Sequence, residues 1–320
     1  MVDPARIEIA IIEDEAELYA ARLMAEIPGV TAHGGRTEAE ILPHCQGATV
    51  LMGLAQCITP AMVEAASRLR WVQALTTGVD PLMTMGCLDA RIPITSGRGI
   101  HGPQMSELAF LYMLNFARDI RAVLRDQRNR TWERRPQRLL MDKTAVIVGV
   151  GLISEDLARR CKAFGMRVVG VSSRASAPGF DAMVPRERIA EATAEADFLI
   201  AVVPLTPQTR HIIDGAVLDA MPARGVFINI ARGPVVDEEA LILRLQAGRI
   251  AGAALDTFID EPLPATSPLW SMENVIITPH IGGMSETYAE QILPLLIHNV
   301  RAFKEGRMSD LRNLVRGDRP

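Results

Sequence analysis

Short apolar runs alternate with segments of helical periodicity along most of this chain. Such alternation is typical of α/β folds with parallel strands. Runs such as AVIVG and FLIAVV lack polar positions, which indicates strands that helices cover on both faces. The sequence therefore predicts doubly wound parallel sheets. The strand-like runs lie at residues 6–13, 49–54, 71–76, 92–97, 144–149, 167–172, 198–204, 225–230, 250–256 and 274–279.

The β/α rhythm is interrupted once, after residue 100. From Pro103 the sequence QMSELAFLYMLNFARDIRAVLRDQ predicts one long helix, and no strand-like run follows before residue 144. We interpret this interruption as the crossing between two domains. The first comprises residues 1–100 together with 284–320, because the helix predicted by SETYAEQILPLLIHNVRAFKEG can return to pack on it. The second comprises residues 101–283.

The composition restricts the class of protein. A chain of 320 residues, 48% of them hydrophobic, is long enough for two cores. The net charge of −4 predicts binding to neither nucleic acid nor an anionic membrane. Charges interrupt the N-terminus where a signal peptide needs an apolar stretch, and no later run is long and apolar enough to span a membrane. We therefore expect a cytoplasmic protein.

The cysteines show neither a C-x-x-C pair nor a metal-ligand spacing. We expect reduced thiols that serve as small buried apolar residues, and no metal site. The cysteines are Cys45, Cys57, Cys87 and Cys161.

A basic stretch contains eight arginines between Arg118 and Arg138. Asp119, Asp126 and Glu133 are interleaved with them at spacings that form pairs on a helix. We therefore expect a solvated or subunit-contacting surface rather than an arm that binds nucleic acid.

The segment AVIVGVGLISEDLA at 145–158 places Gly149 and Gly151 between a strand and a helix. In a dinucleotide-binding turn the first glycine permits the tight turn, and the second lets the backbone approach the pyrophosphate. A third lets the helix pack closely on the strand. Ser154 stands at this third position, where its side chain is expected to move the helix outward slightly without blocking the phosphate path. Taken alone, such a turn is equally compatible with a plain structural turn.

The residues around this turn bear on the choice of cofactor. Glu155 and Asp156 oppose a pyrophosphate by charge unless both point outward. Sites for NAD normally end the next strand with an acidic residue that binds the ribose. Here the strand ends in Ser172, Ser173 and Arg174, and two hydroxyls with a guanidinium suit the additional phosphate of NADP. We predict a preference for NADPH; the alternative is a solvated loop with an incidental arginine.

Polar side chains also follow three strand-like runs further along. Arg232 follows 225–230, Glu261 lies in the loop after 250–256, and His280 follows 274–279. Ligands bind outside the carboxyl ends of parallel strands, so these side chains can converge on one crevice. An arginine can hold a carboxylate and polarise a carbonyl, a histidine can transfer a proton, and a carboxylate stabilises the imidazolium. Together they predict hydride transfer to 2-oxo acids or from 2-hydroxy acids, although each alone fits an ion pair, a turn or a cap.

Over nearly its whole length the chain resembles the D-isomer-specific 2-hydroxyacid dehydrogenases, and most of all the glyoxylate and hydroxypyruvate reductases. The resemblance implies a flavodoxin-like substrate-binding domain and a Rossmann-type NAD(P)-binding domain with a cleft between them. It also implies NAD(P)H-dependent reduction of a small 2-oxo acid to the D-2-hydroxy acid, and a homodimer built on the helix after Pro103. The matching stretches are TTGVDPL (76–82), GIHGPQMSE (99–107), KTAVIVGVGLI (143–153), VVPLTPQTRHII (202–213), INIARGPVVDEEAL (228–241), DTFIDEPLPATSPLW (256–270) and TPHIGG (278–283).

The resemblance implies roles for individual residues. Arg232 would bind the substrate carboxylate and carbonyl, and Glu261 would orient His280, the proton donor. Thr77 and Gly78 would contribute backbone contacts to the substrate carboxylate. The implied cofactor contacts are Gly149, Gly151, Leu152, Ile153, Ser172, Ser173, Arg174, Val203, Pro204, Thr209, Ile230, Asp256 and Gly282.

Two departures from the family pattern leave alternatives open. Ser154 replaces the third glycine, and His101 stands where many members have asparagine, so that His101 contacts a ligand or packs at a hinge. A dehydrogenase-like NAD(P)-binding regulatory protein without turnover is a second hypothesis, which the complete set of Arg232, Glu261 and His280 opposes. Relatives that act on formate resemble this pattern with glutamine in place of Glu261.

Overall fold

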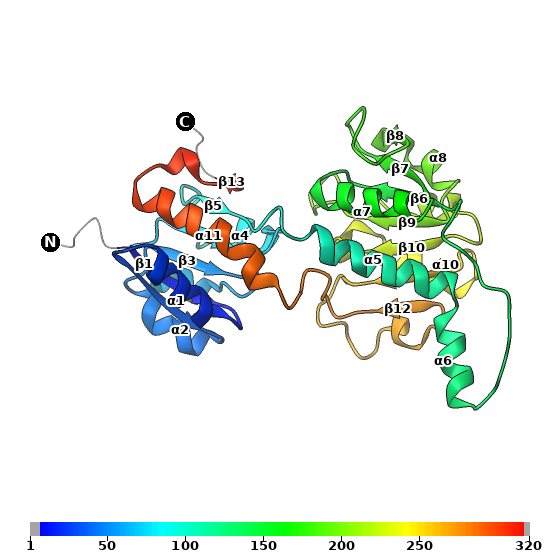
Figure 1. The fold of residues 1–320 in the computed structure, drawn as a ribbon, viewed down its shortest axis with the longest axis horizontal. Helices are drawn as coiled ribbons and strands as arrows, with labels where there is room; N and C mark the ends of the chain where they lie inside the picture. Colours follow the sequence, from blue (N-terminus) through cyan, green and yellow to red (C-terminus); the bar gives the residue numbers. More distant parts are fainter. Residues whose placement is uncertain (1–6, 317–320) are drawn as a thin grey trace. The chain divides into compact units, whose positions relative to one another are not determined.

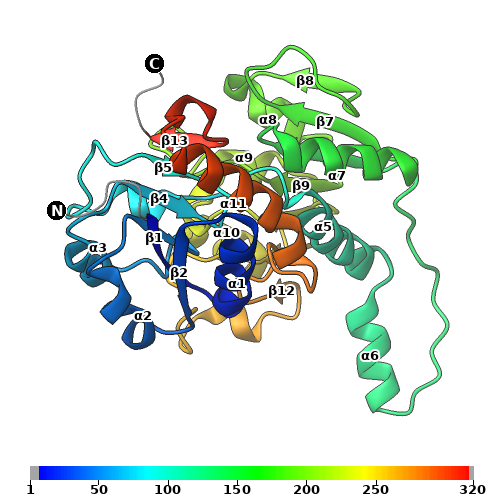
Figure 2. The same cartoon turned by 60° about the vertical axis from the view of Figure 1, so that its left-hand side comes forward.

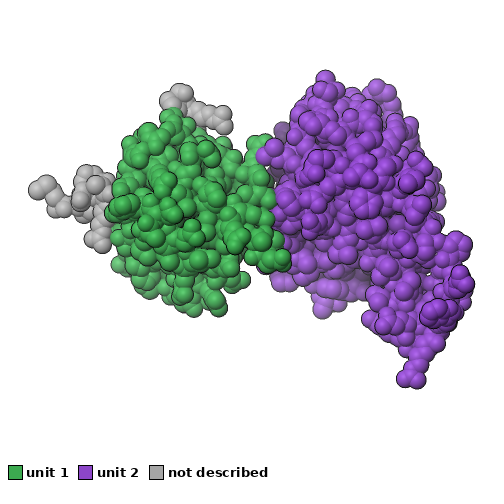
Figure 3. Space-filling model, in the orientation of Figure 1, with its two compact units in different colours: residues 1–100, 285–320 green, residues 101–284 purple. Residues whose placement is uncertain are grey.

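The computed structural model describes residues 7–316. The chain forms two compact units, which Figure 3 shows in different colours. The first unit comprises Met1–Ile100 with Ser285–Pro320, and the second comprises His101–Met284. Each unit is built around a largely or wholly parallel sheet with helices (Figure 1), which confirms the predicted fold class.

The first unit contains a six-stranded sheet with the order β13-β5-β4-β3-β1-β2. Neighbouring strands are parallel except β13, which runs antiparallel to β5. The order of the first five strands is the flavodoxin-like one. The strands are β1 (Ile7–Ile12), β2 (Val30–Gly35), β3 (Val50–Gly53), β4 (Trp71–Ala74), β5 (Ile94–Thr95) and β13 (Leu314–Arg316). The α-helices are α1 (Ala16–Glu26), α2 (Glu38–Cys45), α3 (Pro60–Ala65), α4 (Asp80–Met83) and α11 (Tyr288–Lys304).

The predicted C-terminal helix is present as α11 and belongs to the first unit. It contacts α1, and its buried Leu296 and Val300 join the core that contains Trp71. A helix from the end of the chain thus completes the core of the unit that the beginning of the chain builds.

The second unit contains a seven-stranded parallel sheet with the order β12-β11-β10-β9-β6-β7-β8. The chain runs outward from β6 to β8, then crosses to β9 and runs outward to β12, which is the Rossmann order with an additional strand. The strands are β6 (Thr144–Val148), β7 (Arg167–Val171), β8 (Ala182–Val184), β9 (Phe198–Ala201), β10 (Val226–Asn229), β11 (Gly252–Leu255) and β12 (Val275–Ile277). The α-helices are α5 (Gly102–Ala117), α6 (Ile120–Arg128), α7 (Leu152–Ala163), α8 (Ile189–Thr193), α9 (Gly215–Ala220) and α10 (Glu238–Gln246).

Three strands, β2, β8 and β13, escaped prediction from the sequence. β2 reads VTAHGG and has no apolar run. Helix α1 passes so close to it that a Cβ added to Gly34 would lie 2.4 Å from the carbonyl carbon of Ala16. The glycine that permits this approach also hides the strand pattern. β8 and β13 are three-residue edge strands, whose conformation depends on their neighbours more than on their own residues.

The prediction of one long helix from Pro103 was wrong. The segment forms two helices, α5 and α6, because Asp119 between them adopts a left-handed backbone conformation with φ 46°. Asp126 pairs with Arg135 at 2.6 Å, across nine residues, instead of with an arginine at helical spacing. Figure 2 shows α6 and the loop after it extending from the rest of their unit.

All four cysteines are free thiols. Cys45 and Cys161 are buried as predicted, and burial raises their pKa values to about 11 and about 12. The prediction of burial was wrong for Cys87, which is exposed in a turn outside the sheet. Among residues 7–316, no helix combines the length and the apolarity that crossing a bilayer requires.

Candidate active site

The glycine turn lies where the strand order of the second sheet reverses, between β6 and β9. Gly149 has φ +96°, and a Cβ added to it would lie 2.6 Å from Cγ1 of Val203. Gly151 precedes α7, and no heavy atom lies within 4 Å of a Cβ added there. The turn is thus tight at Gly149 and open in front of the helix start, where backbone N–H groups attract a phosphate. These features fit the pyrophosphate of a dinucleotide.

Ser154 occupies the interior face of α7. Its hydroxyl donates a hydrogen bond to the carbonyl oxygen of Gly149 at 2.6 Å, and the residue is only 1% exposed. The hydroxymethyl group therefore lies inside the turn and is satisfied by it. This contact replaces the close packing that a third glycine permits and leaves the helix start open.

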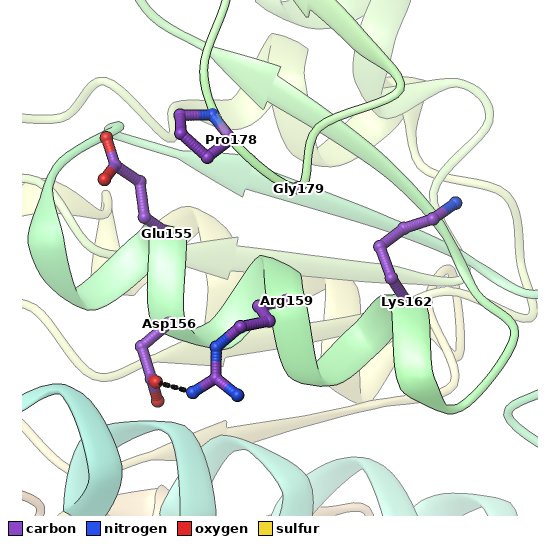
Figure 4. A pocket seen from close by; sticks show the side chains of 6 residues that line it. All are labelled: Glu155, Asp156, Arg159, Lys162, Pro178 and Gly179. Carbon is purple, nitrogen blue, oxygen red and sulfur yellow. Dashed lines mark hydrogen bonds and ion pairs between the residues drawn. The ribbon is translucent and has the colours of Figure 1, made fainter.

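The acidic residues at the start of α7 are neutralised by arginines. The Oε1 atom of Glu155 lies 2.6 Å from Nη1 of Arg174. Asp156 pairs with Arg159 and Arg160 and accepts a hydrogen bond from Ser106 at 2.8 Å. Burial raises the pKa of Asp156, but these hydrogen bonds outweigh it, so the pKa is lowered overall. Figure 4 shows Glu155 and Asp156 leaving α7 on different sides.

The remaining candidate cofactor residues divide into exposed and internal groups. Leu152, Ser173 and Arg174 are exposed, whereas the buried hydroxyl of Ser172 accepts the N–H of Arg174 at 3.2 Å. Thr209 is buried, and its hydroxyl shapes the turn after β9. Its Oγ1 donates to the carbonyl of Pro204 at 2.6 Å.

Asn229 at the end of β10 positions the backbone beside Arg232. The Asn229 side chain is fully buried and donates to the carbonyl of Arg232 at 3.0 Å, while its oxygen accepts the N–H of Ala231 at 3.0 Å. The Arg232 guanidinium in turn donates to the carbonyl of Ala231 at 2.7 Å. A buried amide thus shapes the loop that carries the candidate substrate-binding cation.

Gly233 packs this loop against the loop after β11. A Cβ added to Gly233 would lie 1.9 Å from the carbonyl carbon of Phe258, a distance that no side chain tolerates. The N–H of Phe258 donates to Glu261 Oε1 at 2.9 Å. This close approach therefore places the loop that carries Arg232 and Gly233 beside the loop that carries Phe258 and Glu261.

Glu261 and His280 form a direct pair. Oε2 of Glu261 lies 2.7 Å from Nδ1 of His280. Burial raises the pKa of Glu261, but hydrogen bonds from His280 and Phe258 and the positive charge of Arg232 outweigh it and lower the pKa. The carboxylate therefore stays ionised at neutral pH. Because Nδ1 faces Glu261, Nε2 is the ring nitrogen on the side away from the carboxylate.

Asp256 holds the segment that carries His280. It is 1% exposed and accepts hydrogen bonds from the Thr278 hydroxyl at 2.5 Å and from the N–H groups of Ile281 and Gly282 at 2.9 Å each. His280 itself has φ +54°, an uncommon conformation that surrounding contacts must enforce. Asp256 thus has a positioning role in addition to any contact with the cofactor.

The remaining candidates are Thr77 and Gly78 of the first unit and His101 of the second. Thr77 and Gly78 follow β4 in the first unit, where the hydroxyl of Thr76 donates to the carbonyl of Gly78 at 2.7 Å and so shapes their turn. His101 is buried at the start of α5. A Cβ added to Gly283 would lie 3.2 Å from Cδ2 of the His101 ring.

Comparison with known proteins adds the family. Residues 110–282 match the NAD binding domain of the D-isomer specific 2-hydroxyacid dehydrogenases. The chain belongs to this family. Its membership confirms the predicted oxidoreductase class and an NAD(P) cofactor, which the turn at Gly149 and Gly151 fits.

Individual relatives agree with this membership. A glyoxylate reductase from Thermococcus onnurineus is 31% identical over 94% of this chain and 88% of its own length. A D-3-phosphoglycerate dehydrogenase from Methanocaldococcus jannaschii is 29% identical, and this chain spans 58% of its length. The crystal structure of an NADPH-dependent glyoxylate/hydroxypyruvate reductase from Sinorhizobium meliloti, in complex with NADP and sulfate, is 26% identical. The two structures superpose with a TM-score of 0.83, and the match covers 97% of this chain and 98% of the Sinorhizobium chain.

Sequence reasoning missed the residues that hold the candidate dehydrogenase site in shape. Asn229 and Thr76 were overlooked, as was Tyr112 of α5, whose hydroxyl bonds to that of Thr278. Asn229 did carry a signal, because it is a polar residue in the otherwise apolar strand VFIN. Tyr112 carried none, because its partner is 166 residues away.

Proposed function

We propose that this protein reduces a small 2-oxo acid of the glyoxylate or hydroxypyruvate kind to the D-2-hydroxy acid, and catalyses the reverse oxidation. The observation that carries the proposal is the pair of Glu261 and His280, 2.7 Å apart, within the electrostatic reach of Arg232. This is the set of groups that reduction of a carbonyl beside a carboxylate requires.

Each residue of the set has one task. Arg232 binds the substrate carboxylate and polarises the carbonyl. His280 donates a proton from Nε2 to the carbonyl oxygen, while Glu261 stabilises the imidazolium and fixes its orientation. The nicotinamide supplies the hydride when it is bound. We assign further contacts with the carboxylate to the backbone of Thr77 and Gly78.

We divide the functions between the domains predicted from the sequence. Residues 1–100 with 284–320 contribute to binding the substrate, and residues 101–283 bind the cofactor. The cofactor contacts that we propose are Gly149, Gly151, Leu152, Ile153, Ser172, Ser173, Arg174, Val203, Pro204, Thr209, Ile230, Asp256 and Gly282.

Within NAD(P), we propose a preference for NADPH. The exposed Ser173 and Arg174 follow the strand next to the glycine turn, at the place where an acidic residue would select NADH. The Sinorhizobium enzyme, which is described as NADPH-dependent, supports the same choice.

A panel of 2-oxo acids tests the reaction and the cofactor together. We expect glyoxylate and hydroxypyruvate to be reduced with higher kcat/KM than phenylpyruvate or branched 2-oxo acids, because the proposed site takes small substrates; pyruvate completes the panel. We also expect kcat/KM to be higher with NADPH than with NADH. Binding of NADPH without reduction of any member would contradict the proposal and favour a regulatory protein without turnover.

We also propose a homodimer in which α5, α6 and the loop after them form the interface. Apolar side chains are exposed on these elements: Leu111, Val123, Leu124, Trp132, Leu139 and Met141. Trp132 is 92% exposed, a costly state for an indole in water. Light scattering is expected to give twice the chain mass of 34.9 kDa, and Trp132→Asp to shift the mass toward a single chain. A monomeric wild type would contradict the dimer.

A cytoplasmic location stays a prediction from the sequence.

A further inference from the structure

The Glu155–Arg174 pair joins two elements that border the proposed cofactor site. Glu155 lies in the first turn of α7, and Arg174 lies just beyond the end of β7. Their charged atoms are 2.6 Å apart. The side chains are 25% and 45% exposed, respectively, so the pair is open to solvent on one side.

Neighbouring charges have partners of their own. Asp156 pairs with Arg159 and Arg160, and Lys162 pairs with Asp181 at 2.7 Å. The acidic group that faces Arg174 in the structure is therefore Glu155. The same arginine underlies the proposed preference for NADPH, in which it would contact the additional phosphate of that cofactor, the 2′-phosphate on the adenosine ribose.

A carboxylate and a phosphate compete for one guanidinium. A phosphate monoester carries a charge of about −2 at neutral pH, so a nearby carboxylate repels it. The phosphate of NADPH can pair fully with the Arg174 guanidinium only if the Glu155 carboxylate releases it. NADH carries an uncharged hydroxyl in place of this phosphate. The carboxylate thus opposes the binding of one cofactor and leaves the other largely unaffected.

The surroundings allow Glu155 to move. Glu155 lines a solvent-open hollow of about 420 Å³ beside α7, together with Arg159, Lys162, Pro178 and Gly179 (Figure 4). Its side chain can turn into this space when Arg174 changes partner. The contact with Arg174 is consequently a displaceable one.

We propose that Glu155 is a specificity-determining residue that lowers the preference for NADPH by occupying Arg174. This inference rests on the proposed function, because it assumes that Arg174 contacts the 2′-phosphate. On this inference, part of the charge that attracts the phosphate is already neutralised within the protein, which reduces the difference in affinity between NADPH and NADH.

The test measures the dissociation constants of NADPH and NADH by fluorescence titration for four proteins and a control. The preference is the ratio of the NADH constant to the NADPH constant. Glu155→Gln is expected to raise this ratio about fivefold to tenfold, and Arg174→Ala to lower it about tenfold or more, relative to wild type. The fourth protein carries both Glu155→Gln and Arg174→Ala. Its ratio is expected to differ from that of Arg174→Ala alone by less than about twofold, because the carboxylate has no arginine left to occupy.

Glu195→Gln is the matched control, because it removes a carboxylate from an arginine pair at the other end of β7, where Arg167 lies. It should leave the ratio unchanged. An unchanged or lowered ratio in Glu155→Gln, or equal gains for both cofactors, would overturn the inference. If Arg174→Ala still lowers the ratio, the proposed NADPH site survives that result. If Arg174→Ala leaves the ratio unchanged, both the Arg174 assignment and the inference fail.

Discussion

Replacing His280 with alanine is expected to lower kcat for glyoxylate by about 100- to 10,000-fold, the usual contribution of a general acid. The variant loses the group that donates the proton to the carbonyl oxygen. The NADPH dissociation constant should change by less than about twofold, because the side chain serves the substrate. Steady-state kinetics and fluorescence titration measure the two quantities.

The variant His211→Ala is a matched control for the backbone. His211 has φ +52° and His280 has φ +54°, so both substitutions place alanine in the same uncommon conformation. His211 is exposed, and its backbone N–H bonds to the carbonyl of Pro234 at 2.9 Å in a contact that alanine retains. We expect near-normal turnover for this control. If His280→Ala kept half of the wild-type kcat, His280 would not be the proton donor.

Replacing Arg232 with alanine should have the second large effect, a fall of about 100- to 10,000-fold in kcat/KM for glyoxylate. A bidentate contact comprises two charge-assisted hydrogen bonds, and each contributes about 1.5–3 kcal/mol. Arg232→Lys keeps the positive charge without the planar fork, so an intermediate loss is expected. Saturation kinetics with glyoxylate at fixed NADPH give both values.

Arg188→Ala controls for the loss of a guanidinium elsewhere in the second unit. Arg188 forms an exposed pair with Glu191, and such pairs contribute little to stability. This control should match wild type in kcat/KM. An unchanged KM and kcat in Arg232→Ala would show that the substrate carboxylate is bound elsewhere, and the proposed reaction geometry would be wrong.

Much of the fold was contained in local sequence patterns. Near-continuous apolar runs identified most strands, because strands buried on both faces admit few polar residues. The same logic failed for β2, whose Gly34 serves a close approach by α1, and at Asp119, where a single left-handed residue divides the predicted helix. In both places one backbone position outweighs the periodicity around it.

The sequence by itself determined the chemistry available to this protein: the glycine turn, the arginine, the carboxylate and the histidine all follow strands. The tertiary structure decided how these groups are held and paired. Asn229 shapes the Arg232 loop, Gly233 admits the backbone of Phe258, and Glu155 engages Arg174 from 19 residues away. The physical reason is the distance along the chain over which each kind of information acts. Periodicity records whether a residue is buried, whereas a contact between distant side chains depends on strand order and on how closely two loops approach.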